Sequence, residues 1–299
     1  MNNVIAIVVT FKRKELLAQV LNSLIEQTVT PEKILVIDNN SNDGTKEVVQ
    51  ELSKNAPLIS YYNTGANLGG AGGFYHGFKV ASNFDYSHLW LMDDDFMPDN
   101  DCLDKMLNLN HNGIVQPIRF NMDGSCAELS PVKYDLSSPF LLNPKKESLL
   151  ELYKNGELQE RQELAGIPFE GPLISKAVVE AVGFPKPDFF IFYDDLDYAI
   201  RTRKAGFKII CNKEIKAKRL LTNNQSDDLL SWKGYFMLRN LFYVHKVHGN
   251  NVFVKFKPYL LALSYALLSF CKGQFKQVKI VFQALNDSKN LSNTDLHKP

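Results

Sequence analysis

The chain has 299 residues, of which 45% are hydrophobic and 22% are charged, so it is long enough for one large globular domain or two modest ones. This balance excludes a disordered, collagen-like or coiled-coil protein. The 34 basic and 33 acidic residues leave a formal charge of +1, so no overall charge attracts nucleic acid. The four cysteines are widely spaced and contain no CxxC pair, so they do not fit a disulfide or zinc framework. We therefore expect the protein to reside in the reducing cytoplasm.

The first hundred residues alternate between short apolar runs and segments of helical periodicity. The runs predict strands at residues 4–9, 33–37, 58–62 and 88–92, and helices at residues 16–25, at 44–53 and after Gly73. Continuous apolar runs are typical of parallel strands buried on both faces of a sheet. We therefore expect a doubly wound α/β domain with its ligand crevice at the carboxyl ends of the strands. The first run is too short and wrongly flanked for a signal peptide.

The periodicity weakens between residues 117 and 171, where Pro, Asn, Ser and Gly accumulate. We expect long loops in this region, with one polar helix near residues 145–154. Regular structure is predicted again at residues 173–182 and 194–205, where apolar side chains return at helical spacing.

Three adjacent aspartates, Asp93, Asp94 and Asp95, follow the fourth predicted strand. Their mutual repulsion at the edge of a sheet is costly unless a cation neutralises it. Asp93 and Asp95 alternate to the same side, which suits a hard divalent ion such as Mg²⁺ or Mn²⁺. The same residues are equally consistent with a solvated acidic loop that caps a helix near residues 99–107.

Two polar loops follow earlier strands. Residues 38–45 begin with Asp38, Asn39 and Asn40, and a carboxylate and an amide at the mouth of a crevice can read the edge of a flat polar base. An ordinary strand-to-helix loop with an N-cap explains these residues as well. In residues 67–74, four glycines in five positions permit close approach to a phosphate or sugar, although the pattern matches neither GxGxxG nor a P-loop.

A second acidic cluster comes directly after an aromatic run at residues 189–193. Asp194 and Asp195 stand at the predicted start of a helix, where a carboxylate held out of bulk water is suited to act as a general base. Alternatively, both are first-turn acids favoured by the helix dipole, and Asp197 pairs with Arg201 one turn later.

In this order, the four motifs resemble those of the family 2 inverting glycosyltransferases, which have the GT-A nucleotide-sugar fold. The resemblance covers residues 4 to about 245. The matching residues are Val9-Thr10-Phe11-Lys12-Arg13, Gln27-Thr28, 38–45, Asn67-Leu68-Gly69-Gly70, Asp93 to Asp95 and Asp194 to Arg201. Residues 171–185, residues 232–240 and the Leu-Met-Asp-Asp-Asp form of the acidic motif are most similar to the galactofuranosyltransferase and rhamnosyltransferase branch. This implies a mixed α/β sheet flanked by helices in a catalytic domain over residues 1–222, and a helical C-terminal extension over 223–299.

The resemblance also implies a role for each matching residue. Asp195 is implied as the catalytic base and Asp194 as its support, and Asp93 and Asp95 are implied as ligands of Mn²⁺ or Mg²⁺. The residues implied to bind the donor nucleotide are Thr10, Phe11, Arg13, Asp38, Asn40, Asn67, Gly69, Gly70, Asp93 and Asp94, and those implied to bind the acceptor are Trp232, Tyr193 and Arg239. Relatives often supply a further metal ligand, a His some twenty-odd residues after the base, but residues 214–222 contain no His. The nearest later histidines, His245 and His248, are expected to be structural.

The implied reaction is an inverting transfer of a sugar, galactofuranose from UDP-galactofuranose, to a hydroxyl of a lipid-linked glycan in the synthesis of a bacterial surface polysaccharide. A rhamnosyltransferase using dTDP-rhamnose is the alternative within the branch. A sugar nucleotidyltransferase would usually carry a glycine-rich basic loop after its first strand, where this chain has Thr10 and Phe11. A non-catalytic subunit that retains the fold is the remaining alternative, against which the intact acidic residues argue.

Residues 229–299 contain ten basic and two acidic residues, a net charge of +8 in a chain of net +1. The apolar run at 259–271 is shorter than the roughly 18 residues of a membrane span. Flanked by lysines, residues 259–270 suit a helix lying on an anionic leaflet, which implies peripheral contact with the inner face of the cytoplasmic membrane. The same segment is consistent with a helix that packs on the catalytic domain or on a second subunit.

Overall fold

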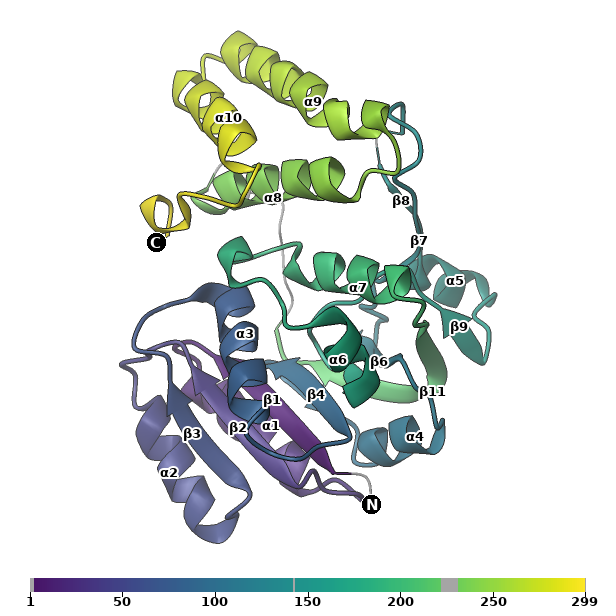
Figure 1. Ribbon diagram of the computed structural model, residues 1–299. Helices are drawn as coiled ribbons and strands as arrows, with labels where there is room; N and C mark the ends of the chain where they lie inside the picture. Colours follow the sequence, from purple (N-terminus) through teal and green to yellow (C-terminus); the bar gives the residue numbers. More distant parts are fainter. Residues whose placement is uncertain (1–2, 142, 222–230, 299) are drawn as a thin grey trace.

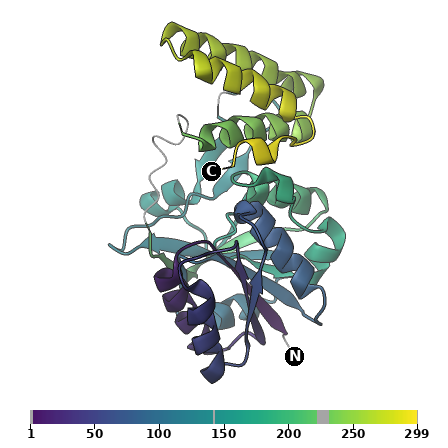
Figure 2. The same ribbon diagram turned by 90° about the vertical axis from the view of Figure 1, so that its left-hand side faces the viewer.

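The computed structural model describes residues 3–141, 143–221 and 231–298. The domain boundary predicted between residues 222 and 223 lies outside the described residues, and so does the end of the segment 214–222. The chain forms a helix-covered mixed sheet, with a layer of three helices above the carboxyl ends of its first strands (Figures 1 and 2).

The amino-terminal half alternates strand and helix as the periodicity predicts. Its elements are β1 (Val4–Thr10), α1 (Lys14–Ile25), β2 (Lys33–Asp38), α2 (Thr45–Asn55), β3 (Ile59–Asn63), α3 (Gly69–Ala81) and β4 (His88–Asp93). The four strands are parallel in the order β3-β2-β1-β4. Separate apolar clusters fill the two faces of the sheet, which is why these strands are apolar at every position.

The second half of the chain extends this sheet with strands of both directions. Its elements are β5 (Phe96–Pro98), α4 (Cys102–Asn108), β6 (Ile114–Asn121), β9 (Arg161–Glu163), β10 (Leu173–Ser175), α6 (Lys176–Val182), η1 (Pro187–Phe189), α7 (Asp194–Lys204) and β11 (Ile209–Arg219). Strand β10 is antiparallel to both β4 and β6, whereas β11 is parallel to β6. The mixed sheet expected from the resemblance is therefore confirmed.

The helix predicted near residues 145–154 begins later than expected. Residues 145–148 form β8 (Lys145–Ser148), which pairs with β7 (Pro131–Tyr134) in a separate hairpin. Helix α5 (Leu149–Asn155) starts only at Leu149 because Ser148 and Glu151 form a reciprocal capping box. This hairpin was not predicted, because its two short strands are mostly polar and are joined by ten residues.

Helix α3 begins at Gly69, five residues earlier than predicted. The glycines are therefore the first turns of the helix rather than a loop. A β-carbon at Gly73 would lie 2.5 Å from a methyl of Val9, and one at Gly77 would lie 2.4 Å from a methyl of Ile7. Gly73 and Gly77 therefore serve close packing of α3 on the sheet. Gly69 and Gly70, at the start of the helix, instead line a cavity.

The carboxyl-terminal part of the described chain forms a helical layer. It contains α8 (Lys233–His248), α9 (Val252–Cys271), α10 (Phe275–Asp287) and η3 (Thr294–Leu296). A third apolar cluster joins this layer to the catalytic half through Phe190, which packs on Phe236 of α8. Among the described residues, α9 is the one helix that is long and apolar enough to cross a membrane, and 33% of its most apolar window is buried.

Candidate active site

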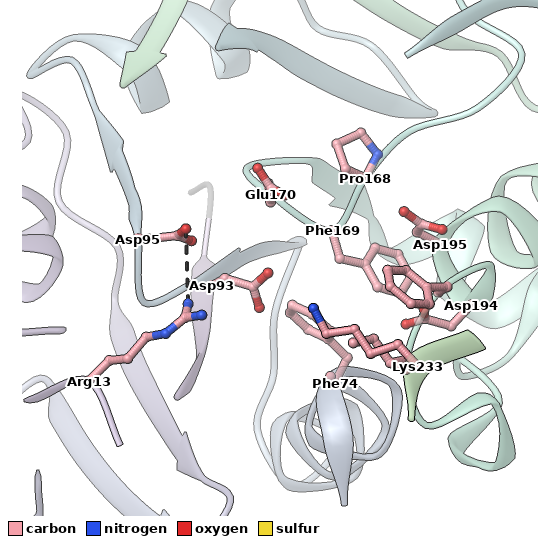
Figure 3. Close-up of a pocket in the computed structure, with 13 residues that line it drawn as sticks. Arg13, Phe74, Asp93, Asp95, Pro168, Phe169, Glu170, Asp194, Asp195 and Lys233 are labelled. Atoms are coloured by element: carbon pink, nitrogen blue, oxygen red, sulfur yellow. Dashed lines mark ion pairs between the residues drawn. The ribbon is translucent and has the colours of Figure 1, made fainter. Parts of the chain in front are cut away.

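Three neighbouring cavities lie between the sheet and the helical layer. The β1 cavity, about 370 Å³, lies beside Thr10, Phe11, Asn67 and Trp232. The central cavity, about 330 Å³, holds most of the acidic residues (Figure 3). The β7 cavity, about 350 Å³, is bordered by Tyr134, Tyr193 and Met237 among others. Neighbouring cavities share lining residues, so the three lie side by side with the central cavity in the middle.

Asp195 stands where two of these cavities meet. It lines both the central cavity and the β7 cavity, as do Pro168 and Phe192. At the other side of the central cavity, the residues shared with the β1 cavity are Arg13, Gly70, Asp93, Ile191 and Lys233. A ligand that extends from the β1 cavity would therefore pass the acidic turn before it reaches Asp195.

The three aspartates after β4 have different surroundings. Asp93 is partly exposed and lines the β1 and central cavities, and Asp95 lines the central cavity. Asp94 is instead bonded to the loop after β1: it accepts hydrogen bonds from the Thr10 hydroxyl at 2.8 Å and from Arg13 at 3.1 Å. Asp94 therefore fixes the loop after β1 against the acidic turn, although it also borders the β1 cavity.

The central cavity concentrates negative charge. Burial and the neighbouring charges of Asp95 and Glu170 raise the pKa of Asp93 well above its ordinary value. Burial, Glu170 and Asp94 raise the pKa of Asp95 to about 6, against the opposing effect of Arg13. The cations that border this acidic turn are Lys233 and Arg13, whose guanidinium lies 4.0 Å from Asp95 (Figure 3).

Glu170 is a site residue that the sequence motifs missed. Figure 3 shows it between the Asp93 and Asp95 pair and the Asp194 and Asp195 pair. Its carboxylate accepts a hydrogen bond from Arg119 and lies 3.1 Å from the Nε of Arg219. Arg119 is buried and also pairs with the buried Glu128 at 2.7 Å. Because these partners come from β6, β11 and the segment before β7, only the folded sheet brings them to Glu170.

Asp194 and Asp195 form the first turn of α7, as predicted. The backbone before them is strained: Phe190, Phe192 and Tyr193 have φ angles of 65°, 65° and 69°, a region that non-glycine residues seldom adopt. Burial raises the pKa of Asp195 to about 6, the Leu196 amide opposes this, and Glu170 adds to it. Burial and the charge of Asp195 raise the pKa of Asp194 well above its ordinary value.

Two residues of α8 hold this strained segment in place. The Asn240 amide donates to the carbonyl oxygens of Phe189, Ile191 and Phe192 at 3.1, 2.8 and 3.0 Å. The Arg239 guanidinium donates to the carbonyl oxygens of Asp188 at 2.6 Å and Phe189 at 3.1 Å. Arg239 is fully buried, so its expected contact with an acceptor does not fit this placement. The hydrogen bonds of Arg239 instead hold the backbone that precedes Asp194 and Asp195.

The expected pairing within α7 is confirmed. Arg201 donates to Asp197 at 2.8 Å, one helical turn away. Asp197 also lies 2.7 Å from the Nε2 of His248, which is buried at the end of α8. His245 is buried as well and bonds to the carbonyl of Leu241. Both histidines are therefore structural, as expected.

In the loop after β2, Asp38 and Asn40 were expected to bind the donor nucleotide, but neither of them lines the β1 cavity. Asp38 is fully buried, and its carboxylate accepts hydrogen bonds from the Tyr61 hydroxyl at 2.6 Å and the Ser41 amide at 2.9 Å. Asn39 lines the β1 cavity, whereas Asp38 and Asn40 are not among its lining residues. The sequence did not distinguish Asn39 from Asn40, because both follow the strand directly.

The two remaining acceptor candidates lie in different cavities. Tyr193 lines the β7 cavity, next to Asp195. Trp232 is 40% exposed and lines the β1 cavity instead. Of the three predicted acceptor residues, Tyr193 alone therefore borders the cavity on the far side of Asp195.

The acidic turn fits a metal ion that shares its coordination with a ligand. Within the described part of the chain, no group of three His, Cys, Asp or Glu side chains is arranged to hold a metal. Asp93 and Asp95 are oxygen donors whose repulsion a cation would relieve. Mg²⁺ is commonly bound by one or two carboxylates together with phosphate oxygens of a substrate, and this donor set matches that pattern.

Comparison with known proteins identifies relatives with similar sequences. The chain is 32% identical over 214 residues to the galactofuranosyltransferase GlfT1 of Mycolicibacterium smegmatis, a match that covers 68% of this chain and 66% of that protein. It is 31% identical to GlfT1 of Mycobacterium tuberculosis, again over 68% and 66% of the two chains. The chain thus spans slightly less than two thirds of the length of these relatives.

Solved structures with the same fold include enzymes bound to sugar nucleotides or manganese. The mannosyltransferase PcManGT of Pyrobaculum calidifontis, in complex with GDP-Man and Mn²⁺, matches with a TM-score of 0.58 and 17% identity over 96% of this chain and 75% of its own. GalNAc-T7 with UDP, GalNAc and Mn²⁺ matches with a TM-score of 0.58 and 10% identity over 82% of this chain and 51% of its own. These likenesses establish the GT-A fold.

The family model described as glycosyl transferase family 2 matches residues 5–154, about half of the chain. This region contains nearly all of β1 to β4, the acidic turn and most of the residues that line the β1 cavity. The chain belongs to glycosyltransferase family 2.

Proposed function

We propose that this glycosyltransferase is an inverting galactofuranosyltransferase, which transfers galactofuranose from UDP-galactofuranose to a hydroxyl of a lipid-linked glycan. The observation that carries the proposal is the position of Asp195 at the junction of the central and β7 cavities. The similarity to proteins named galactofuranosyltransferases supports the choice of sugar.

In this proposal the donor nucleotide occupies the β1 cavity. Thr10, Phe11, Asn67 and Gly69 line that cavity, and Gly70 continues its wall into the central cavity. Asp38 and Asn40 flank Asn39, which lines the cavity at the end of β2, and the Asp38 carboxylate accepts a hydrogen bond from Tyr61 rather than facing the cavity. This placement directs the diphosphate of the donor toward the acidic turn.

The diphosphate is proposed to lie between the acidic turn and the two cations of the central cavity. Arg13 and Lys233 border the path that the phosphates would take. Asp93 and Asp95 would hold Mn²⁺ or Mg²⁺ there, and the ion would neutralise the charge that develops on the leaving nucleoside diphosphate. Asp94 positions Arg13 through its 3.1 Å contact, so its contribution to donor binding is indirect.

Asp195 is proposed to remove the proton of the acceptor hydroxyl as that hydroxyl attacks the anomeric carbon. A single displacement of this kind inverts the configuration and needs one base and no enzymatic nucleophile. A positioned general base typically contributes 10²–10⁴-fold to the rate. The buried Asp194 stands beside it in the first turn of α7, where burial and the charge of Asp195 raise the pKa of Asp194.

The acceptor is proposed to enter through the β7 cavity. Tyr193, Tyr134 and Met237 give this cavity an aromatic and apolar wall, and Lys145 supplies a cation. Such a surface suits the flat face of a sugar ring followed by an apolar carrier. A lipid-linked acceptor would place the enzyme in the cytoplasm, at the inner face of the membrane, in the synthesis of a bacterial surface polysaccharide such as a capsule or an O-antigen.

A donor screen tests the choice of sugar. The full chain is incubated with Mn²⁺ and a short synthetic galactan acceptor, and the release of nucleoside diphosphate from UDP-galactofuranose, UDP-galactopyranose, UDP-glucose and dTDP-rhamnose is compared. We expect acceptor-dependent release from UDP-galactofuranose, at a rate at least about tenfold above the others. A preference for dTDP-rhamnose would replace this proposal with a rhamnosyltransferase.

A further inference from the structure

Helix α9 exposes the large apolar side chains that a helix of a water-soluble domain usually buries. The buried residues on its side toward α8 and α10 are mostly small or polar, including Ala262, Ala266 and Ser269, and the partly buried Leu261 and Tyr265 pack beside them. The opposite side of the helix is exposed and carries Phe253, Phe256, Leu260, Leu263, Leu267, Leu268 and Phe270. Most of these positions are separated by three or four residues, so they form one continuous face.

The exposed apolar face continues beyond α9. Phe270 packs on Phe275 at 5.6 Å between ring centres, which joins the end of α9 to the start of α10. At the other end of α9, Asn251 donates to Ser137 at 2.6 Å and Lys257 donates to Leu141. Both bonds attach α9 to the turn of the β7–β8 hairpin, in which Phe140 is 90% exposed. We call this combined surface of α9, Phe275 and Phe140 the apolar platform.

Among the described residues of the helical layer, the exposed charges that lack an ion-pair partner are positive. Exposed lysines stand at Lys255 near the start of α9, at Lys272 between α9 and α10, and at Lys276 and Lys279 on α10. The acidic residues of the helical layer are Asp287 and Asp295. Asp287 is buried and accepts from the Tyr235 hydroxyl at 2.8 Å, whereas Asp295 is paired with Lys298 beyond α10. The platform therefore presents apolar side chains together with unneutralised positive charge.

We propose that the apolar platform docks on the interfacial region of an anionic lipid bilayer. Contiguous exposed apolar surface indicates a binding site, and the surrounding lysines complement anionic lipid headgroups. A second copy of the chain fits less well, because a symmetric dimer would bring the lysines of one copy against those of the other. A membrane span also fits less well, because α9 packs on α8 and α10 along its length, and Lys255 and Lys257 lie in its first turns.

This docking would bring the membrane to the β7 side of the active site. The β7–β8 hairpin contributes Pro131, Tyr134 and Lys145 to the β7 cavity, and its turn contributes Phe140 to the platform. Figure 1 shows this hairpin running from the level of α7 up to α9. The hairpin thus connects the bilayer surface to the cavity in which an acceptor is proposed to bind. This last link rests on the proposed function, whereas the docking itself does not.

Cosedimentation of the full chain with vesicles tests the docking. Vesicles of phosphatidylcholine alone are compared with vesicles containing one third phosphatidylglycerol, at low and at high NaCl. We expect binding to the anionic vesicles that falls at least about tenfold in high salt, because exposed charges are screened. Binding to neither vesicle, or equal and salt-resistant binding to both, would overturn the proposal.

Two sets of variants separate the contributions of the platform. Leu260→Gln/Leu263→Gln/Leu267→Gln removes exposed apolar side chains, and Met122→Gln, at an exposed residue 61% accessible in the sheet domain, is its control. Lys276→Gln/Lys279→Gln is compared with Lys46→Gln/Lys213→Gln. We expect each platform variant to lose at least about fivefold in vesicle binding while its control binds like the parent. If the leucine variant binds as the parent does, or if its only effect is to disperse a dimer in light scattering, the platform does not face a membrane.

Turnover of a short water-soluble acceptor distinguishes this inference from the proposed function. The leucine variant should keep the parent's rate with that acceptor, because the three side chains are outside the cavities. A parent that binds vesicles but transfers no galactofuranose would contradict the proposed function and leave the docking intact. A leucine variant that loses its turnover with the soluble acceptor would instead show that the platform supports the active site rather than a membrane.

Discussion

Replacing Asn240 with alanine tests whether its hydrogen bonds to the segment before α7 position Asp195. The substitution removes an amide whose contacts reach three carbonyl oxygens, those of Phe189, Ile191 and Phe192, and an oxygen that accepts from Arg239 at 3.0 Å. At roughly 1 kcal/mol for each lost hydrogen bond, the free energy of unfolding should fall by about 2–4 kcal/mol.

The strained backbone gives this loss a catalytic consequence. A positive φ costs a non-glycine residue about 1–2 kcal/mol, and Phe190, Phe192 and Tyr193 all have one. Without the Asn240 amide, the segment is free to relax and carry Asp195 away from its position between the cavities. A shift of about 1 Å at a reacting group is enough to lower turnover roughly a hundredfold.

The assay compares kcat, the KM for the donor and the melting temperature. Val281→Ala is the matched control, because Val281 is fully buried in the same helical layer and its truncation should cost about 2–3 kcal/mol without touching the segment. We expect Asn240→Ala to lose kcat and Val281→Ala to keep it, at a temperature where both are folded. Equal kcat in the two variants would refute the positioning role of Asn240.

Three further predictions concern the acidic residues. Asp195→Asn should lower kcat at least about a hundredfold with little change in donor binding measured by calorimetry, whereas Asp135→Asn, at a partly exposed residue outside the three cavities, should change neither. A large rise in donor KM with a small loss of kcat would take Asp195 out of the base role. Asp95→Ala should weaken the Mn²⁺ dependence and donor binding together, and a variant that responds to Mn²⁺ like the parent would show that Asp95 is not a metal ligand. Because the base must be deprotonated and burial raises the pKa of Asp195 to about 6, kcat should fall as the pH falls through about 6. Glu170→Gln should move this limb of the pH–rate profile to lower pH, because the charge of Glu170 raises the pKa of Asp195. A limb that does not move would show that a group other than Asp195 controls it.

The strands and helices of the first hundred residues were predictable because their apolar side chains occur at the positions that the fold buries. Every residue of β1 is buried, so its apolar run is unbroken. The acidic turn and the pair at the start of α7 were also found, since carboxylates at these places are conspicuous in a sequence. The β7–β8 hairpin was missed, because its short strands are mostly polar and partly exposed, so no alternation of apolar and polar residues marks them.

The residues that complete the site were less accessible to sequence reasoning. Glu170 faces the central cavity only because Arg119 and Arg219, from two paired strands, hold its carboxylate. A single glutamate in a loop carries no spacing that would identify it. Arg239 shows the converse case: its place in a motif suggested contact with substrate, but its guanidinium is buried against the backbone before α7. Its role is thus defined by tertiary contacts.

The most direct test of the proposed activity is the stereochemistry of the product. The full chain is incubated with UDP-galactofuranose, Mn²⁺ and a short galactan acceptor, and the new glycosidic bond is assigned by NMR. We expect a galactofuranosyl linkage with the anomeric configuration opposite to that of the donor, formed by the parent and nearly absent with Asp195→Asn. A product that retains the donor configuration, or no transfer of galactofuranose, would contradict the single displacement proposed here.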